Sequence, residues 1–176
     1  MEDEILDEEL SMMYEEPERT KTLDSNTFLK PVRSLKLRKP VTVDLNQSVQ
    51  EALSVMQAKR FGCVLVTAGS TLAGILTERD IVGKALGKGR DLKAVPVKEL
   101  MTADPVTLQQ DDSVAFVLNA MHVGGYRHVP IVDDKNRPLA VVSVKDIIGF
   151  IVDHFPEEIL NLPPKPIRKT EHLDGG

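Results

Sequence analysis

Residues 74–80 read Gly-Ile-Leu-Thr-Glu-Arg-Asp, and residues 140–146 read Ala-Val-Val-Ser-Val-Lys-Asp. Each stretch is an apolar run that is followed by a hydroxyl residue, two spacers and an aspartate. Each also ends a longer segment in which the order of residues is repeated, from 40 to 83 and from 105 to 149. A repeat of about 65 residues is too long for a solenoid unit, so it indicates a small domain that has been duplicated.

Inside each copy the hydrophobic period changes from strand-like to helix-like and back. Ser48 and Glu51 have the spacing of a capping box at the start of a helix. The apolar stripe of that helix recurs in the second copy, as Val49, Ala52, Leu53 and Met56 and then as Val114, Val117, Leu118 and Met121. Two short apolar strands follow, predicted at 63–66 and 72–76 and again at 129–132 and 139–142.

A second helix is predicted to begin at Thr77 or Ser143, so each copy is β-α-β-β-α. Neither copy is large enough to bury its own sheet face. We therefore expect a mixed α/β (α+β) fold in which the two sheets pack on each other and the helices lie outside.

Composition limits the class of protein. With 176 residues and 41% hydrophobic residues, the chain can bury the core of one domain or two small ones. No segment approaches the roughly 18 apolar residues that span a bilayer. The N-terminus lacks the regions of a signal peptide and Cys63 has no partner for a disulfide, so we expect a cytoplasmic protein. The absence of Trp and the 4% aromatic content argue against a base-stacking nucleic-acid surface.

The net charge of −5 is unevenly distributed. Residues 1–19 hold nine acids against Arg19, which leaves 18 acidic and 21 basic residues in the rest of the chain. That body is compatible with an anionic ligand but too weakly basic to indicate DNA binding by charge alone. A basic stretch at 30–39 leaves nucleic-acid binding as the weakest alternative.

The chain is divided into six parts. They are an acidic leader (1–19), a connector (20–39), a first repeat (40–86), a linker (87–100), a second repeat (101–155) and a tail with Pro and Gly (156–176). The leader is either a solvated tail or a helix that docks on a partner through Ile5, Leu6, Leu10 and Met13.

The repeated ending has a structural and a functional interpretation. Thr77 and Asp80 alone would be explained as a helix cap. However, the ending directly follows a buried strand, occurs at the same place in both copies, and has a basic residue, Arg79 or Lys145, just before the aspartate. A carboxylate suits the hydroxyls of a ribose, while a helix N-terminus and a nearby cation suit phosphate. Together these features predict a nucleotide site.

The chain resembles the family of tandem cystathionine-β-synthase (CBS) domains, also called Bateman modules, over roughly residues 25–155. The matching stretches are Pro40-Val-Thr-Val43, Gly74-Ile-Leu-Thr-Glu-Arg-Asp-Ile81, Met101-Thr-Ala-Asp-Pro-Val-Thr107, Gly125-Tyr-Arg-His-Val-Pro-Ile-Val132 and Val142-Ser-Val-Lys-Asp-Ile147. The resemblance implies a regulatory module whose cleft between the repeats binds AMP, ADP or ATP, or less often S-adenosylmethionine.

Two pockets follow from the resemblance, each with the aspartate helix of one repeat and the early threonine of the other. The first pocket would use Thr42, Arg127, His128, Val141, Ser143, Lys145 and Asp146. The second pocket would use Ile75, Thr77, Arg79, Asp80 and Thr107. In the first pocket Asp146 would bind the ribose hydroxyls, Ser143 and Thr42 would bind phosphate or ribose, and Val141 would pack on the adenine.

We expect the first pocket to be the better nucleotide site. Arg127 and His128 would face its phosphates, whereas the matching positions in the first copy are Gly62 and Cys63. In the opposite direction, Ala140 stands where the first copy has Gly74, and a methyl group there would crowd a ligand. Mutation of Asp146→Ala is expected to abolish most nucleotide binding, and Asp80→Ala to weaken it less.

No constellation of residues predicts catalysis, a cofactor or a metal. His122, His154 and His172 have no partner at metal-ligand spacing, and Cys63 is interpreted as a small buried hydrophobe. The leading interpretation is therefore a free-standing, homodimeric nucleotide sensor that is read by an effector protein and has no membrane segment. The alternative is an assembly module with vestigial pockets that dimerises through its second helices, with Ile81, Val82, Leu86, Ile147, Ile148, Phe150 and Ile151.

Overall fold

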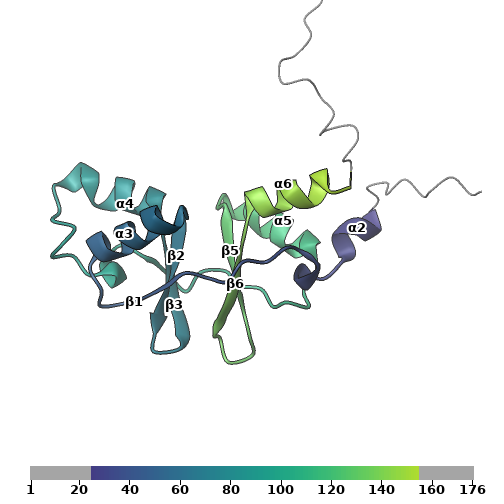
Figure 1. Ribbon diagram of the computed structural model, residues 1–176, viewed down its shortest axis with the longest axis horizontal. Helices are drawn as coiled ribbons and strands as arrows, with labels where there is room; N and C mark the ends of the chain where they lie inside the picture. Colours follow the sequence, from purple (N-terminus) through teal and green to yellow (C-terminus); the bar gives the residue numbers. More distant parts are fainter. Residues whose placement is uncertain (1–24, 155–176) are drawn as a thin grey trace, which may run out of the picture. The chain divides into compact units, whose positions relative to one another are not determined.

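The computed structural model describes residues 25–154, and the acidic leader and the C-terminal tail lie outside this range. The first repeat contains β1 (Thr42–Asp44), α3 (Val49–Lys59), β2 (Cys63–Ala68), β3 (Thr71–Thr77) and α4 (Glu78–Lys84). The predicted β-α-β-β-α order is therefore confirmed in this copy (Figure 1). The predicted capping box is also confirmed, because Ser48 accepts from the amide of Glu51 and the Glu51 side chain accepts from Ser48.

The second repeat contains α5 (Val114–Gly124), β5 (His128–Val132), β6 (Pro138–Ser143) and α6 (Val144–Val152). The segment before it holds the two-residue strand β4 (Thr102–Ala103). The segment before the first repeat holds α2 (Ser25–Leu29) and the single-turn helix η1 (Val32–Ser34). Two further single turns, η2 (Leu86–Lys88) and η3 (Val97–Glu99), lie between the repeats.

The first sheet has the strand order β1-β2-β3-β4. Strand β1 is parallel to β2, and the other neighbours are antiparallel. A parallel pair needs a crossover connection, which α3 provides. The second sheet has the same order of segments, but only its two central segments are full strands. Its two full strands are β5 and β6, and its edges are single bridges from Leu108 to Ile131 (parallel) and from Arg38 to Val141 (antiparallel).

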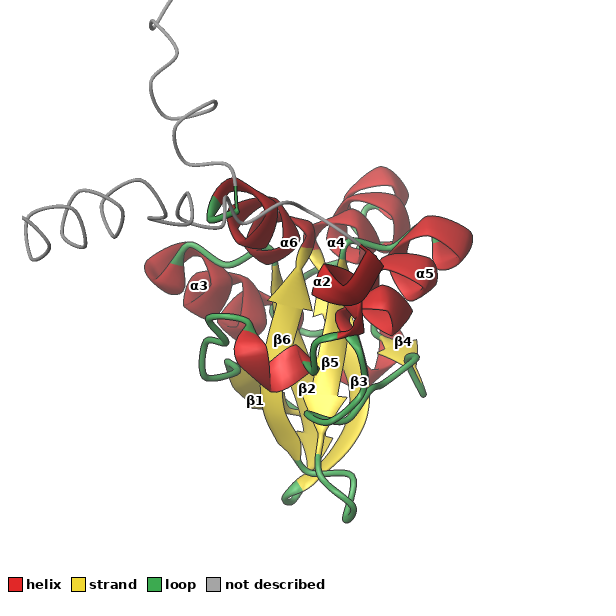
Figure 2. Ribbon diagram, turned by 90° about the vertical axis from the view of Figure 1, so that its right-hand side faces the viewer, coloured by secondary structure: helices red, strands yellow, loops and turns green. Residues whose placement is uncertain are grey.

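Strand β2 is apolar along most of its length because both of its faces are buried. Val64 and Val66 pack with α3 residues in one core cluster, and Cys63 and Leu65 lie in a second. This second cluster also contains Val132 of β5, and Val141 of β6 packs against it. The predicted packing of the two sheets is therefore confirmed, and Figure 2 shows the strands gathered between the helices.

Each repeat is completed by the segment that precedes the other repeat. Pro96 bridges to Ser48, and the amide of Val97 donates to Gln47 at 2.8 Å. In the same way Pro31 bridges to Ser113, and the amide of Val32 donates to Asp112 at 2.7 Å. The sequence repeat thus extends further than residue 40, since Pro-Val-Arg-Ser-Leu at 31–35 corresponds to Pro-Val-Lys-Glu-Leu at 96–100.

Candidate functional site

The loop between β6 and α6 holds the Asp146 carboxylate in a fixed orientation. Its Oδ2 accepts from the backbone amide of Ser143 at 2.8 Å and from the Ser143 hydroxyl at 2.6 Å. In return, the Asp146 amide donates to the Ser143 hydroxyl oxygen at 3.4 Å. This reciprocal cap commits one carboxylate oxygen to the helix and leaves the other, Oδ1, directed away from the cap.

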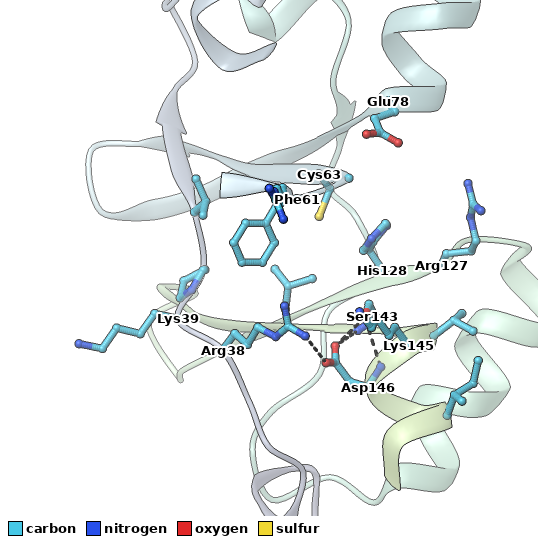
Figure 3. Close-up of a pocket in the computed structure, with 17 residues that line it drawn as sticks. Arg38, Lys39, Phe61, Cys63, Glu78, Arg127, His128, Ser143, Lys145 and Asp146 are labelled. Carbon is cyan, nitrogen blue, oxygen red and sulfur yellow. Dashed lines mark hydrogen bonds and ion pairs between the residues drawn. The ribbon is translucent and has the colours of Figure 1, made fainter. Parts of the chain in front are cut away.

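A cavity of about 450 Å³ lies over this carboxylate. That volume is in the range of small-molecule pockets. Both repeats contribute to its walls, and Figure 3 shows the Asp146 carboxylate between side chains from distant segments. The lining includes Val41, Phe61, Gly62 and Cys63 from the first repeat and its approach, and Val141, Ser143 and Asp146 from the second.

Positive charge predominates around the cavity. The basic residues are Arg38, Lys39, Arg60, Arg127 and Lys145, against the two acids Glu78 and Asp146. Arg38 lies 3.8 Å from Asp146 Oδ1, which is longer than a hydrogen bond. In Figure 3 Arg38 and Lys39 lie on one side of the Asp146 carboxylate and Arg127 lies on the other. The cavity is therefore suited to a ligand with hydroxyl donors and several negative charges.

Arg60 is placed at the rim by an unusual backbone conformation. It is the C-cap of α3 with φ of 55°, and the C-cap of α5 is Gly125 with φ of 66°. The left-handed region is costly for a residue with a Cβ, and glycine relieves that cost. The first repeat therefore retains a strained arginine at a position where the second has glycine.

Two side chains of the cavity have shifted pKa values. Burial, followed by the charge of Arg127, lowers the pKa of His128 below its usual value, although Glu78 and Asp146 act in the opposite direction. Burial, with a smaller effect of Glu78, raises the pKa of Cys63 to about 12. Cys63 is buried, as predicted, and its thiol is held in the neutral form. His128 near neutral pH is an uncharged donor and acceptor.

A second cavity of about 370 Å³ lies over the corresponding ending of the first repeat. Thr77 and Asp80 form the same reciprocal cap, with the Thr77 hydroxyl donating to Asp80 Oδ2 at 2.6 Å. The lining residues include Ile75, Thr77, Arg79, Asp80, Thr102, Asp104, Arg127 and His128. Here the charges are balanced, because Arg79 and Arg127 face Asp80 and Asp104.

Most of the predicted site residues lie where the sequence interpretation placed them. Arg127, His128, Val141, Ser143, Lys145 and Asp146 line the first cavity, and Ile75, Thr77, Arg79 and Asp80 line the second. The two threonines do not line either cavity. Thr42 begins β1 and is exposed, and it is Val41 that reaches the first cavity. Thr107 is likewise replaced by Pro105 and Val106 in the second.

Neither the Arg127–His128 pair nor Ala140 distinguishes the two cavities in the way that the sequence predicts. Arg127 and His128 line both cavities, so they do not distinguish one from the other. Ala140 is buried and does not line the first cavity. The glycine at the matching position 74 serves the chain itself, because a Cβ there would lie 2.6 Å from the Met101 sulfur and 2.8 Å from the Thr102 carbonyl oxygen.

Several lining residues were missed in the sequence. Arg38 and Lys39 precede the repeat as first delimited, and Arg60, Phe61 and Glu78 carry no motif of their own. The overlooked match of 31–35 with 96–100 would have aligned Arg38 with Ala103 of β4, and both residues pair with the strand that precedes the aspartate helix. Within residues 25–154, no cluster of His, Cys, Asp and Glu could hold a metal ion. None of the helices described there is long and apolar enough to cross a membrane.

The chain belongs to the CBS domain family. The family matches it twice, at residues 32–87 and 97–153, and so covers both repeats with the segments that precede them. A CBS-domain-containing protein of Agrobacterium tumefaciens has the same fold with a TM-score of 0.65 and 30% identity, over 74% of this chain and 99% of that one. The CBS domain pair of protein MJ0100, in complex with 5′-methylthioadenosine and S-adenosyl-L-methionine, has a TM-score of 0.65 and 26% identity, over 71% and 98%.

Longer proteins carry the same module. A CBS domain-containing protein of Arabidopsis thaliana is 34% identical over 69% of this chain, and the match spans 22% of that relative's length. A protein of Acidianus ambivalens is 31% identical over 69% of this chain and 73% of its own. The chain therefore spans about a fifth of the length of the Arabidopsis relatives that it matches.

Proposed function

We propose that this CBS pair is a regulatory module that binds an adenine nucleotide, AMP, ADP or ATP, in the first cavity. The observation that carries the proposal is the Asp146 carboxylate, because its Oδ2 forms the helix cap and its Oδ1 takes no part in it. It lies in a pocket lined by five basic side chains. An available carboxylate oxygen accepts from ribose hydroxyls, while the surrounding cations compensate phosphate charge.

The charge of the cavity also favours one class of adenosine ligand over another. Protein MJ0100 binds S-adenosyl-L-methionine, which is a cation at its sulfur. Five basic residues against two acids would repel that sulfonium and attract phosphates. S-adenosylmethionine is therefore the alternative ligand. The contact of Arg38 with the Asp146 carboxylate is long, so a ribose that binds Asp146 would displace Arg38, which would then bind a phosphate.

Calorimetric titration of ligand-stripped protein with AMP, ADP and ATP tests the proposal. Saturable binding is expected, with Asp146→Ala weakening it about tenfold to a hundredfold, the range for hydrogen bonds to a charged group. Asp80→Ala is the matched variant, because it removes an equivalent helix cap, and it should weaken binding less. Absence of heat and of thermal stabilisation with all three nucleotides would refute the proposal. Equal losses in the two variants would refute the assignment to the first cavity.

Regulation requires the ligand to change the arrangement of the module. A ligand shifts an equilibrium only if it binds the two arrangements with different affinity. Because both repeats line the first cavity, a bound nucleotide would contact both and favour one packing of the two sheets. Small-angle scattering profiles with and without saturating nucleotide should differ. Identical profiles would contradict a large rearrangement.

A second candidate function is assembly of the module into a homodimer. Val82 of α4 and Ile148 of α6 occupy matching positions and are 60% and 55% exposed, and Leu86 nearby is 62% exposed. Exposed apolar side chains gathered on the second helices are typical of an interface. The mass in solution, measured by light scattering, should be that of a dimer and should fall for Val82→Glu combined with Ile148→Glu. An unchanged mass would rule out this surface.

A further inference from the structure

The two aspartates of the repeated ending differ in what their outer carboxylate oxygen contacts. In each, Oδ2 is committed to the helix cap. Among residues 25–154, Oδ1 of Asp146 has only the long contact with Arg38 at 3.8 Å. Oδ1 of Asp80, in contrast, lies 2.7 Å from the Lys84 ammonium one helical turn away. The Thr102 hydroxyl also donates to it, at 3.4 Å.

Lys84 is held in this position from a second side. Its ammonium donates to the carbonyl of Leu100 at 2.7 Å and lies 3.5 Å from that of Met101. Both carbonyls belong to the segment that closes the first repeat. Three acceptors therefore surround one ammonium, which matches its three donors. The contact with Asp80 is thus part of a small network rather than an isolated ion pair.

We infer that Lys84, which lies beside the second cavity and does not line it, takes up the Asp80 oxygen that a ribose would need there, so that this CBS pair binds one nucleotide per chain, in the first cavity. The inference rests on the proposed function for the identity of the ligand. A ribose that reached Asp80 would have to replace Lys84 and Thr102, because a carboxylate oxygen has two lone pairs and both are in use. It would also leave the Lys84 ammonium without its anion.

The remaining charges of the two cavities agree with this assignment. Burial would by itself raise the pKa of Asp80, but the hydrogen bonds from Lys84 and Thr77 and the charge of Lys84 together lower it. Asp80 is thus kept ionised by a partner inside the protein. In the second repeat the position that matches Lys84 is Phe150, whose ring lies 6.4 Å from that of Phe28 and supplies no charge.

The experiment counts nucleotide sites in variants of Lys84. Lys84→Met removes the ammonium and keeps the length of the side chain, while Lys84→Gln keeps a donor for the Leu100 carbonyl. Lys88→Met is the matched control, because it removes the same charge from an exposed residue of η2. Each variant is also made together with Asp146→Ala, so that the first site is removed and only the second is measured. Thermal unfolding identifies the variants that fold, and titration with AMP and ATP gives the number of sites.

The wild type and Lys88→Met should bind one nucleotide per chain, and Lys84→Met and Lys84→Gln should bind two. In the Asp146→Ala background, the Lys84 variants should bind at least about tenfold more tightly than Asp146→Ala alone. A further Asp80→Ala should abolish the gained site. Two equal sites in the wild type would overturn the inference, as would folded Lys84 variants that gain none. If Lys84→Met does not fold, Lys84→Gln decides, and if neither folds, the wild-type number of sites decides.

The proposed function is judged separately, by whether the wild type binds any nucleotide. A wild type that binds none, with Lys84 variants that bind one, would refute the first cavity as the site and support the role of Lys84. A wild type that binds two nucleotides would support the proposed function and refute the role of Lys84.

Discussion

Leu72 and Asn136 are joined by two hydrogen bonds across the repeats. The amide of Leu72 donates to the Asn136 carbonyl at 2.9 Å, and the Asn136 side-chain amide donates to the Leu72 carbonyl at 3.2 Å. Leu72 belongs to β3, and Asn136 lies in the turn between β5 and β6. Asn136 is in the left-handed region, with φ of 55°. The turn of one hairpin is therefore attached to a strand of the other.

Asn136→Ala should lower the free energy of unfolding by about 2 kcal/mol, because it removes the side-chain hydrogen bond to Leu72 and because alanine tolerates the left-handed region less well than asparagine. Asn136→Gly keeps the backbone conformation at no steric cost and should lose mainly the hydrogen-bond part, although glycine also loosens the unfolded chain. Urea denaturation gives both values. If both variants unfold at the wild-type midpoint, the bond between the hairpins does not stabilise the fold.

Gly74→Ala should destabilise the protein by about 1–3 kcal/mol, as overpacking of a core position does. Its Cβ would lie 2.6 Å from the Met101 sulfur and 2.8 Å from a backbone oxygen of Thr102, and only the first of these can move easily. Gly83→Ala is the control, since no atom lies within 4 Å of its Cβ position in α4. That change should raise the free energy of unfolding by about 0.5–1 kcal/mol. Similar effects of the two substitutions would contradict the close approach of β4 to β3.

His128 should make the protein less stable in mildly acidic solution. Its pKa is lowered from 6.5 in the folded protein, by burial first and then by Arg127. Between that lowered pKa and 6.5 the unfolded chain binds more protons, so the free energy of unfolding falls as the pH drops through this window. The lowered pKa of Asp80 acts separately, because its contribution is lost only at pH below the ordinary value of 3.8.

Urea midpoints of the ligand-free protein, measured between about pH 7 and pH 5, check this expectation. His128→Gln removes the titrating group and should have a flatter profile over this range than the wild type. His122→Gln, at an exposed position of α5, is the control and should keep the wild-type slope. A steeper fall in His128→Gln would show that the assigned direction is wrong.

Arg60→Gly should separate stability from binding. Relief of the left-handed conformation gains about 1–2 kcal/mol, and the entropy of glycine removes about 0.5–1 kcal/mol, so a net rise in the free energy of unfolding of up to about 1.5 kcal/mol is expected. Loss of a cation from the first cavity should weaken ATP binding more than AMP binding. Arg60→Asn tolerates the same φ and also lacks the charge, so it should share the loss in affinity. Unchanged binding in both variants would remove Arg60 from the site.

The elements of the fold could be predicted because their signals are local. Ser48 and Glu51 determine where α3 begins, and the apolar runs of β2 and β3 lie between turn residues. The aspartate ending was predicted for the same reason, since Thr77 and Asp80 contact each other within one helical turn. Six of the seven residues that the resemblance implied for the first cavity line it.

The site residues that could not be predicted from the sequence are positioned by contacts between distant segments. Arg38 reaches Asp146 because its segment bridges to Val141 more than a hundred residues away. Nothing in the sequence distinguishes Lys84 from other lysines, because the carbonyls of Leu100 and Met101 that surround it come from a later segment. Thr42 and Thr107 were implied by the resemblance, but the residues just before them, Val41 and Val106, line the cavities instead.

The segments 31–35 and 96–100 each pack on the repeat that does not follow them directly in the chain, and this exchange limits where the chain can be cut. Val97 and Leu100 belong to the core of the first repeat but precede the second in the chain, and Val32 makes the converse exchange. A chain cut between residues 88 and 94 would give two fragments that each carry a piece of the other's interior. Such fragments should be poorly folded alone and should reassociate as a complementing pair. We therefore expect the two repeats to unfold as one cooperative unit, and a single repeat alone would have to exchange these segments with a second molecule of itself.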